Sequence, residues 1–354
     1  MLNRRAVSFL LIIAVLCAGG CETARYKRFQ TEFTGLFDTA TVIIAYAQSA
    51  DEFGLYAEII YNRMEELHRL YDIYNAYEGV NNLYTVNQNA GAAPVEVDRD
   101  IIDLLLFARE GYDLSGGAVN VAMGPVLRIW HEYREEGLAL PPMGALLEAS
   151  RNTDINDLII DEAGGTVFLR KPGMSLDVGA VAKSYAAGLA IRAASDAGMI
   201  SGLLSAGGNV TAAGKPMDGR NRWGVGIQEP EPSADNTREQ ADTVYCSDTT
   251  VSCSGGYQRF YVVDGQAYHH IIDPGALMPA NLYKQVAVIH RDAGMADLLS
   301  TALFILPYEE GAALAARRGA EALWIDTDGA WRATDGYAAI SKTLSDYSAS
   351  DGSP

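Results

Sequence analysis

The sequence predicts an α+β fold, a single large body of mixed, mainly antiparallel sheets with packed helices. Two hairpin patterns support this class, one at residues 158–169 and one at residues 260–272 with an Asp-Gly turn. Helical patterns are interspersed with the strands without regular strand-helix-strand alternation, which favours α+β over α/β. Of the 354 residues, 49% are hydrophobic, so the chain can bury a sizeable core.

The first elements follow from residue type and spacing. A run of β-branched residues predicts a strand at 38–47. Apolar residues at helical spacing predict helices at 51–70 and, after a capping Asp98, at 101–112. Between these two helices, the asparagine-rich segment 81–90 is predicted to be a turn.

The middle of the chain mixes helices and strands. A short helix is expected at 143–151, and an alanine-rich helix at 181–197 follows a short strand that ends at Asp177. Strands around glycine turns are expected at 203–211 and 223–227.

The last third begins with an acidic segment at 229–242, rich in Pro and Ser, which is predicted to be an exposed loop. After the hairpin at 260–272, a strand at 285–290 precedes an apolar helix at 295–306. A further helix and a hairpin that turns at Asp328-Gly329 complete the fold.

The chain begins like a bacterial lipoprotein. Arg4 and Arg5 precede an apolar run at 6–16 that is too short to span a bilayer comfortably, and small residues precede Cys21. We expect residues 1–20 to be a signal peptide and Cys21 to carry a lipid, which would anchor the protein at the extracytoplasmic face of the cell membrane. An ordinary cleaved signal with an incidental cysteine is the alternative.

Composition divides the remaining chain and limits its partners. Residues 21–35 are predicted to be a tether, 36–342 one folded domain and 343–354 a disordered tail. The net charge of −18 falls by two more units if Arg4 and Arg5 leave with the signal. This acidity argues against nucleic acid as a partner and against electrostatic adhesion to anionic lipid.

Two cysteines remain after those at the start of the chain. Cys246 and Cys253 are separated by seven positions, with no CxxC motif and no nearby pair of histidines, so they do not form a zinc-site pattern. A disulfide and two free thiols both remain open.

Asp297 and Thr301 are four residues apart on a predicted helix and therefore share one face. A carboxylate and a hydroxyl on one face are hard oxygen ligands that suit Mg²⁺. The alternative is an Asp that interacts with the helix dipole and a Thr that bonds back to the preceding turn.

The segment Asp177–Tyr185 leads through Gly179-Ala180 into a helix. Such a turn exposes backbone groups at a helix start, where phosphate is favoured. The Ala180 carbonyl is a candidate metal ligand, and Lys183 is long enough to reach a phosphate or a ribose oxygen. A plain junction with a solvated lysine is the alternative.

The segment His269-His270-Ile271-Ile272-Asp273-Pro274 follows a predicted hairpin. Adjacent strand residues face opposite ways, so only one of the two histidines can face a given site. A neutral histidine near an acid is a candidate general base for a hydroxyl nucleophile. A half-buried hairpin histidine is the alternative.

These three segments, in this order, resemble the FAD:protein FMN transferases of the ApbE family. The resemblance extends from about Phe37 to Ile340 and includes the further segments 117–125, 204–209, 223–230 and 254–259, together with Tyr74 and Asn87. It implies an ApbE-like fold and the use of FAD as substrate with Mg²⁺ as cofactor.

The resemblance also implies roles for individual residues. Mg²⁺ would be bound by the Ala180 carbonyl, Asp297 and Thr301. His270, which matches the family histidine, or Asp273 would act as general base. FAD would be contacted by a set of residues in which Tyr74 packs on the flavin: Phe37, Tyr74, Ala118, Val119, Asn120, Asp177, Lys183 and Ile272.

Three departures from the family pattern stand out. Asn120 and Asn209 each replace an Asp, and Gly275-Ala276-Leu277 replaces a basic residue followed by Thr-Gly. None of them alters Asp177, Asp297 or Thr301, so we expect binding to survive, while turnover or the choice of protein substrate differs.

The implied reaction is Mg²⁺-dependent transfer of FMN from FAD to a Ser or Thr hydroxyl of a target flavoprotein, with release of AMP. A membrane respiratory or ion-pumping flavoprotein is the expected acceptor. Two alternatives remain open: a non-catalytic FAD-binding lipoprotein, and a pyrophosphatase that cleaves FAD to FMN and AMP.

Overall fold

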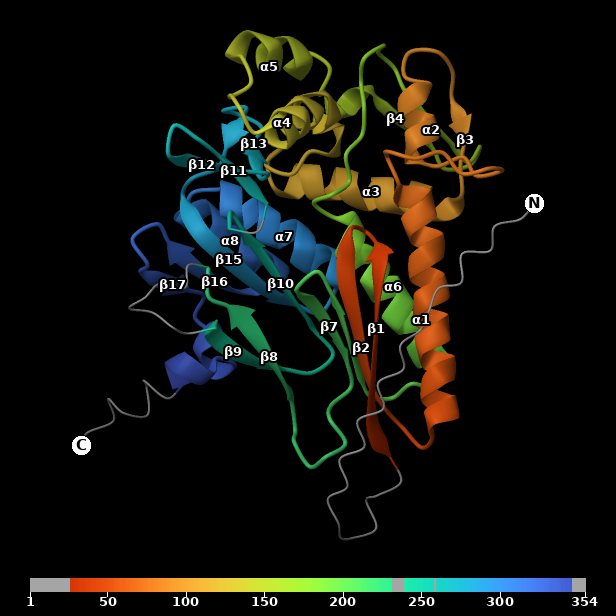
Figure 1. Ribbon diagram of the computed structural model, residues 1–354, viewed down its shortest axis with the longest axis vertical. Helices are drawn as coiled ribbons and strands as arrows, with labels where there is room; N and C mark the ends of the chain where they lie inside the picture. Colours follow the sequence, from red (N-terminus) through yellow and green to blue (C-terminus); the bar gives the residue numbers. More distant parts are fainter. Residues whose placement is uncertain (1–25, 231–238, 258, 346–354) are drawn as a thin grey trace.

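The computed structural model describes residues 26–230, 239–257 and 259–345. An eight-stranded sheet, in which every pairing is antiparallel, forms the centre of the molecule (Figure 1). Its strands in spatial order are β1 (Lys27–Leu36), β2 (Thr39–Ala47), β6 (Gly202–Ala206), β7 (Asn209–Ala213), β10 (Thr250–Gly255), β15 (Tyr283–His290), β16 (Glu321–Asp326) and β17 (Trp331–Ala333).

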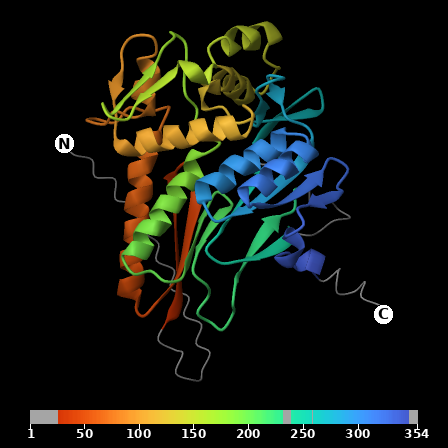
Figure 2. The same cartoon turned by 180° about the vertical axis from the view of Figure 1, so that it is seen from behind.

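Helices cover one face of this sheet. They are α1 (Ala50–Tyr71), α6 (Ala182–Asp196), α7 (Ala293–Ile305) and α8 (Tyr308–Arg318), and Figure 2 shows them from that side. The largest apolar core lies between these helices and the sheet, and it includes Ile60, Ala187 and Leu299. Nearly all the side chains of α7 are buried, as its apolar sequence predicts.

The other face of the sheet is covered by a hairpin of β8 (Trp223–Gln228) and β9 (Gln240–Cys246). A second apolar cluster, which includes Trp223, Val244 and Ile325, fills this side together with Tyr337 from the end of the chain. The sheet is therefore buried on both faces.

A smaller part of the molecule lies beyond one end of the sheet (Figure 1). It contains four helices, a three-stranded sheet and two short hairpins. These elements are α2 (Leu83–Gln88), α3 (Arg99–Leu114), α4 (Gly124–Glu136), α5 (Met143–Ser150), β3 (Val95–Glu96), β4 (Leu158–Asp161), β5 (Thr166–Leu169), β11 (Phe260–Val263), β12 (Gln266–His269), β13 (Ile272–Asp273) and β14 (Met278–Pro279).

The α+β prediction and most predicted elements are confirmed. Asp98 caps α3 through the Asp100 N–H, and the β4–β5 and β11–β12 hairpins form where expected. In the second hairpin, Asp264 and Gly265 both have positive φ (52° and 79°), as a two-residue turn of this kind requires.

Several predictions were wrong. The predicted tether at 21–35 is a strand from Lys27 onward, because Phe29, Thr31 and Phe33 alternate inward and pair with β2. The predicted turn at 81–90 contains α2, whose start is capped by Asn82. No strand ends at Asp177, and β9 begins inside the predicted loop 229–242.

The predicted tail at 343–354 is also wrong at its start. Residues 343–345 are helical, and the Thr343 N–H donates to a buried Asp242. Helix α4 is an element that the sequence patterns did not indicate; it begins with Pro125 in its first turn and ends at Gly137 in the left-handed conformation. The predicted signal peptide and Cys21 lie outside the described residues.

Within the described ranges, no helix has the length and apolar character needed to cross a membrane.

Candidate active site

Asp297 lies in the second turn of α7, where its side chain is 7% exposed. Asp297 does not cap the helix. The cap is Asp292, whose side chain accepts from the Met295 N–H. Asp297 Oδ1 accepts from Asn209 Nδ2 (2.8 Å) and Ser252 Oγ (2.9 Å), and Oδ2 accepts from the Ser184 backbone N–H (3.3 Å). Its partners therefore come from three other elements.

All three donors to Asp297 are neutral. Among the residues that the structure describes, no Lys, Arg or His lies within ion-pair distance of this carboxylate. A buried charge is normally paired or bound to a metal. The charge of Asp297 is thus left for a cation to balance.

Ala180 offers a second oxygen. Ser184 is the third residue of α6, where a backbone N–H has no partner within the helix, and its N–H donates to Asp297. No hydrogen bond to the Ala180 carbonyl occurs among residues 26–230, 239–257 and 259–345. This open carbonyl lies in the turn that leads into α6, and the Ser184 N–H joins the start of the same helix to the Asp297 carboxylate.

Thr301 offers a third oxygen, one turn along α7 from Asp297. Its hydroxyl contacts Ser254 Oγ (3.4 Å), whereas the hydroxyl that bonds back to the helix belongs to Ser300, which donates to the Asp297 carbonyl (2.9 Å). The structure therefore shows neither of the alternatives: Asp297 does not lie in the first turn, where it would interact with the helix dipole, and the Thr301 hydroxyl does not bond back to the preceding turn.

A carboxylate, a hydroxyl and a backbone carbonyl are a hard-oxygen donor set, which fits Mg²⁺. In the described part of the chain, no group of three or more His, Cys, Asp or Glu side chains could hold a metal. A metal at this site would be held by a carboxylate, a hydroxyl and a carbonyl rather than by a cluster of titratable residues.

Helices α6 and α7 approach closely enough to build this arrangement because glycines face the partner helix. A Cβ on Gly188 would lie 2.9 Å from the Ala293 side chain, and one on Gly294 would lie 2.8 Å from Tyr185. Ser184, which precedes Gly188 in α6, contacts Asp297, which follows Ala293 in α7, so the two helices run antiparallel. This arrangement brings the 177–183 turn to α7.

Asp177 is held in the turn before α6. Its backbone N–H donates to the Val121 carbonyl (2.8 Å), and Oδ1 accepts from the Gly179 N–H (2.9 Å). Burial raises the pKa of this carboxyl, while the Gly179 N–H and the nearby His131 and Arg134 act in the opposite direction.

Asn87 fixes the residue before Asp177. Its side chain accepts from the Leu176 N–H (2.7 Å) and donates to the Leu176 carbonyl (3.0 Å), so it replaces the strand partner that this extended segment lacks. The family resemblance includes Asn87, and in the structure its side chain binds both backbone polar groups of Leu176.

Lys183 lies in the first turn of α6 and extends over the β6–β7 turn. A Cβ on Gly207 would lie 3.2 Å from its Nζ and 2.6 Å from Thr39, and Gly207 has φ +57°. The close approach of the lysine therefore depends on glycine at this position.

Tyr74 supplies exposed aromatic surface near Asp177, whereas Phe37 is partly buried against the main core. Tyr74 is 59% exposed, and its ring centroid lies 5.9 Å from that of His131. Phe37 and Asp38 form the tip of the β1–β2 hairpin, both with positive φ (51° and 52°), and the Phe37 N–H donates to His68 Nδ1 (3.3 Å).

Asp72 positions the Tyr74 loop. Its carboxylate accepts from the Tyr74 and Asn75 N–H groups (2.7 and 3.0 Å), the Asn75 side chain (3.0 Å) and the Tyr77 hydroxyl (2.8 Å). Burial alone would raise the pKa of Asp72, but these hydrogen bonds outweigh it and hold the pKa below its usual value.

The two histidines have different surroundings: β12 ends at His269, and His270 lies in the bend that follows the strand. The His269 ring uses both nitrogens, Nε2 with the Ala280 carbonyl (2.6 Å) and Nδ1 with the Ile271 N–H (3.2 Å), and it packs edge-on against Phe304. His269 is therefore structural.

Among the described residues, the His270 ring has one hydrogen-bond partner, the Arg259 carbonyl, which lies 3.3 Å from Nδ1. Since a carbonyl only accepts, Nδ1 carries the hydrogen and Nε2 keeps its lone pair. Burial, followed by the charge of Arg259, the neighbouring His269 and the charge of Arg134, lowers the pKa of His270 to about 4. The ring is neutral at pH 7.

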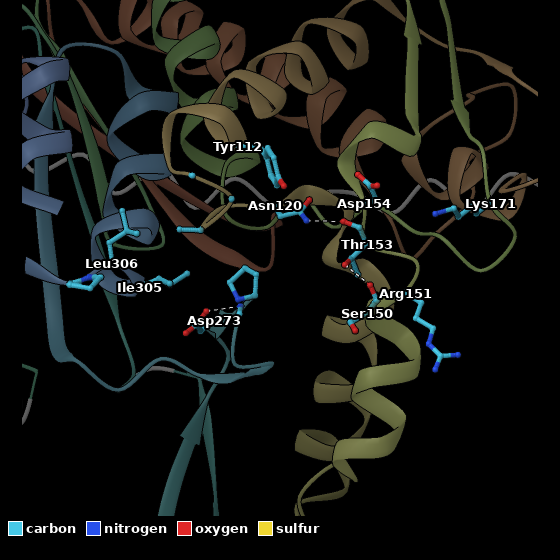
Figure 3. A pocket seen from close by; sticks show the side chains of 16 residues that line it. Tyr112, Asn120, Ser150, Arg151, Thr153, Asp154, Lys171, Asp273, Ile305 and Leu306 are labelled. Atoms are coloured by element: carbon cyan, nitrogen blue, oxygen red, sulfur yellow. Dashed lines mark hydrogen bonds between the residues drawn. The ribbon is translucent and has the colours of Figure 1, made fainter. Parts of the chain in front are cut away.

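Asp273, Ala118 and Asn120 line a cavity of about 780 Å³ (Figure 3). Asp273 lies on one wall with Ile305 and Leu306, and its Oδ1 accepts from the Gly275 N–H (2.8 Å). The Asn120 side chain donates to the Thr153 carbonyl (2.9 Å) on the other wall. Because Thr301 and Ile305 are four residues apart on α7, the cavity begins one helical turn from the candidate metal ligand.

Val119 and Ile272 are almost fully buried, at 2% and 6% exposure. Each therefore offers little surface to a ligand in this structure. The structure thus brings Asp177, Ala180, Asp297 and Thr301 to one end of α6, whereas Asp273, Ala118 and Asn120 lie at the cavity.

The sequence analysis gave no role to the neutral donors around Asp297 or to Asp72 and His131. Ser252 and Ser254 lie on one face of β10, since alternate strand residues point the same way. That serine alternation was a signal, but its meaning required knowing that β10 packs against α7.

Comparisons with known proteins identify the family of this chain. The model of the ApbE family matches residues 37–324. A Treponema pallidum FAD:protein FMN transferase is 36% identical over 72% of this chain and 73% of its own length, and one from Klebsiella pneumoniae is 30% identical over 76% and 82%.

Solved structures share the fold. The crystal structure of the Thermotoga maritima ApbE protein superposes with a TM-score of 0.77 at 26% identity, over 89% of this chain and 99% of that one. The flavin transferase ApbE from Vibrio cholerae gives 0.75 at 23% identity, over 88% and 99%. With a family match over most of the chain, close relatives and a shared fold, this protein belongs to the ApbE family.

Proposed function

We propose that this chain is an FAD:protein FMN transferase that uses Mg²⁺ to transfer FMN from FAD to a Ser or Thr hydroxyl of a flavoprotein, releasing AMP. The names of its relatives support the transferase activity. The observation that carries the metal requirement is the buried carboxylate of Asp297, whose partners among the described residues are all neutral.

The metal would be held by Asp297, Thr301 and the Ala180 carbonyl, and when bound it would neutralise charge on the FAD diphosphate. Lys183 would bind a phosphate oxygen from the first turn of α6. Tyr74 would pack on the flavin, with its loop fixed by Asp72.

The bond changes are those of a phosphoryl-centre displacement. The acceptor oxygen forms a bond to the phosphorus on the FMN side, and the bond from that phosphorus to the bridging oxygen breaks, so AMP leaves. His270 Nε2 is available to take the hydroxyl proton, because its other nitrogen is engaged with the Arg259 carbonyl. Asp273 is the second candidate base.

The same site would also suit FAD storage or hydrolysis to FMN and AMP, and one assay separates the three. The protein is incubated with FAD, Mg²⁺ and a peptide that carries an acceptor Thr, and peptide mass and free AMP are measured. A peptide that gains FMN supports the transferase. Free AMP and FMN with unchanged peptide indicate a hydrolase, and neither product indicates a carrier.

We further propose that Cys21 is lipidated and that the protein acts at the extracytoplasmic face of the membrane on a membrane respiratory or ion-pumping flavoprotein. The charged start, apolar run and small residues before Cys21 support this. Labelling with a fatty acid in cells should mark the wild-type chain and leave Cys21→Ala unlabelled; equal labelling of both would refute lipidation at this residue.

A further inference from the structure

Asn209 stands next to the candidate metal ligand at a position where the family pattern has Asp. It is the first residue of β7, directly after the Gly207-Gly208 turn, and is 5% exposed. The sequence analysis treated this change as a departure without a role.

The Asn209 amide is fully engaged. Nδ2 donates to Asp297 Oδ1 (2.8 Å) and Ser184 Oγ (2.8 Å), and Oδ1 accepts from the Cys253 N–H (3.2 Å). The reverse orientation of the amide would point its oxygen at the Asp297 carboxylate and its NH₂ at the Cys253 N–H, so only one orientation satisfies all partners.

These bonds distinguish the two oxygens of Asp297. Oδ1 accepts from Asn209 and from Ser252 Oγ (2.9 Å), which occupies both of its lone pairs. Oδ2 accepts a single, longer bond from the Ser184 N–H (3.3 Å). The oxygen with unused capacity is therefore Oδ2, which contacts the first turn of α6.

We propose that Asn209 is a positioning residue that, together with Ser252, holds Asp297 by Oδ1 and thereby presents Oδ2 to a divalent cation. An aspartate in its place could not donate to Asp297, so this chain orients the Asp297 carboxylate with neutral groups. The inference rests on the proposed function, because it assumes that Asp297 binds the metal.

The chain provides matched controls on the same strands. Thr211 lies two residues after Asn209 on β7, and Thr250 lies two residues before Ser252 on β10, so each shares its face. Thr250 Oγ1 donates to Thr211 Oγ1 (3.1 Å), and both residues are buried, but neither contacts Asp297. Thr211→Val and Thr250→Val therefore remove buried hydroxyls without releasing the carboxylate.

The test titrates Mn²⁺ into the full chain with FAD present and follows the EPR signal of free Mn²⁺. Asn209→Ala and Ser252→Ala should each weaken Mn²⁺ binding about tenfold or more, because each removes a hydrogen bond to a charged group. Both should raise the Mn²⁺ concentration for half-maximal transfer while keeping most of kcat at saturating Mn²⁺. The two Thr→Val controls should bind Mn²⁺ as the wild type does.

Asp297→Asn separates failure of the inference from failure of the proposed site. If Asp297→Asn binds Mn²⁺ like the wild type, the metal site itself is wrong. If it loses Mn²⁺ while Asn209→Ala and Ser252→Ala match their Thr→Val controls, the metal site stands and the positioning role is overturned. Thermal melts of all variants identify any that do not fold. If Asn209→Ala does not fold, Ser252→Ala alone is sufficient for the test.

Discussion

Individual side chains in this protein have partners that the linear sequence does not suggest. Asp297 and Asp292 are both acids near the start of α7, yet Asp292 caps the helix and Asp297 contacts β7, β10 and α6. His269 and His270 are adjacent, yet one has both nitrogens occupied and the other keeps a free Nε2. The hydrogen-bond partners of each residue are decided by the direction in which its side chain points from its helix, strand or loop.

The first prediction at the residue scale compares the two acids of α7. Asp297→Ala should abolish metal binding and FMN transfer, because it removes the carboxylate that would bind the metal. Asp292→Ala should cost about 1 kcal/mol of stability through the lost cap but retain transfer. Isothermal titration with Mg²⁺ and the peptide mass assay check both, and full transfer by Asp297→Ala would reject the metal assignment.

The second prediction concerns pH. The folded pKa of His270, about 4, lies below its unfolded value, so the unfolded chain binds this proton more readily. The contribution of neutral His270 to stability is therefore complete above the unfolded pKa and is lost as pH falls through about 4. Nε2 also stays unprotonated at neutral pH.

We accordingly expect the acid limb of kcat/KM due to His270 to lie near pH 4, well below the usual range for histidine. His270→Ala should reduce kcat by about 10²-fold or more and remove that limb. A pH-rate profile of both proteins is the measurement. An acid limb near pH 6.5 that disappears in His270→Ala would contradict the lowered pKa.

At the scale of elements, side-chain hydrogen bonds hold the irregular segments that carry the site. Asp72 holds the Tyr74 loop after α1, and Asn87 of α2 pairs with the backbone of Leu176 before the Asp177 turn. Residues 174–178 have no strand partner, so this side-chain pairing takes the place of a sheet ladder.

The third prediction tests that pairing. Asn87→Ala leaves the Leu176 N–H and carbonyl without partners and should lower stability by about 1–3 kcal/mol. It should also raise KM for FAD, because Asp177 follows directly. Asn81→Ala, which removes one exposed bond to the Glu96 carbonyl, should do neither. Urea unfolding that shows equal stability for the two variants would contradict this reading of Asn87.

At the scale of the whole molecule, the buried carboxylate of Asp242 binds residues 337–343 on the second face of the sheet. Asp242 in β9 is 2% exposed and accepts from the Tyr337 hydroxyl (2.9 Å), the Ser341 hydroxyl (2.6 Å) and the Thr343 N–H (3.0 Å). The β8–β9 hairpin and the C-terminal segment therefore cover the sheet together.

The fourth prediction follows from this contact. Asp242→Ala should destabilise the protein by at least about 3 kcal/mol, because it leaves several buried donors unpaired. Removing residues 346–354 should leave Tm nearly unchanged, because every Asp242 contact is retained. Calorimetry checks both, and a Tm that falls as far in the truncated protein as in Asp242→Ala would disprove the assignment.

The two remaining cysteines are free thiols in the structure, which answers the choice that their spacing left open. Burial raises the pKa of Cys253 to about 11, so this thiol stays protonated at neutral pH. Its backbone N–H, not its sulfur, contributes to the site, through Asn209.

Much of the fold was accessible from the sequence where local signals were strong. The Asp264-Gly265 turn, the Asp98 cap and the apolar length of α7 each encode their element within a few residues. Predictions failed where the signal was tertiary. Strand β1 is polar on its exposed face and becomes a strand only through pairing with β2, and the short helix α2 lies in an asparagine-rich segment but is capped by Asn82 and buries Leu83 and Val86.

The sequence by itself determined the α+β class, most element positions and, through the order of its motifs, the family and the residues to consider. Only the tertiary structure decided that Ser184, Asn209 and Ser252 surround Asp297, that the Ala180 carbonyl is left open, and that His270 rather than His269 has a free nitrogen. The reason is physical: caps, turns and periodicity act over a few neighbouring residues, whereas a buried charge takes its partners from strands and helices that meet only when the chain packs.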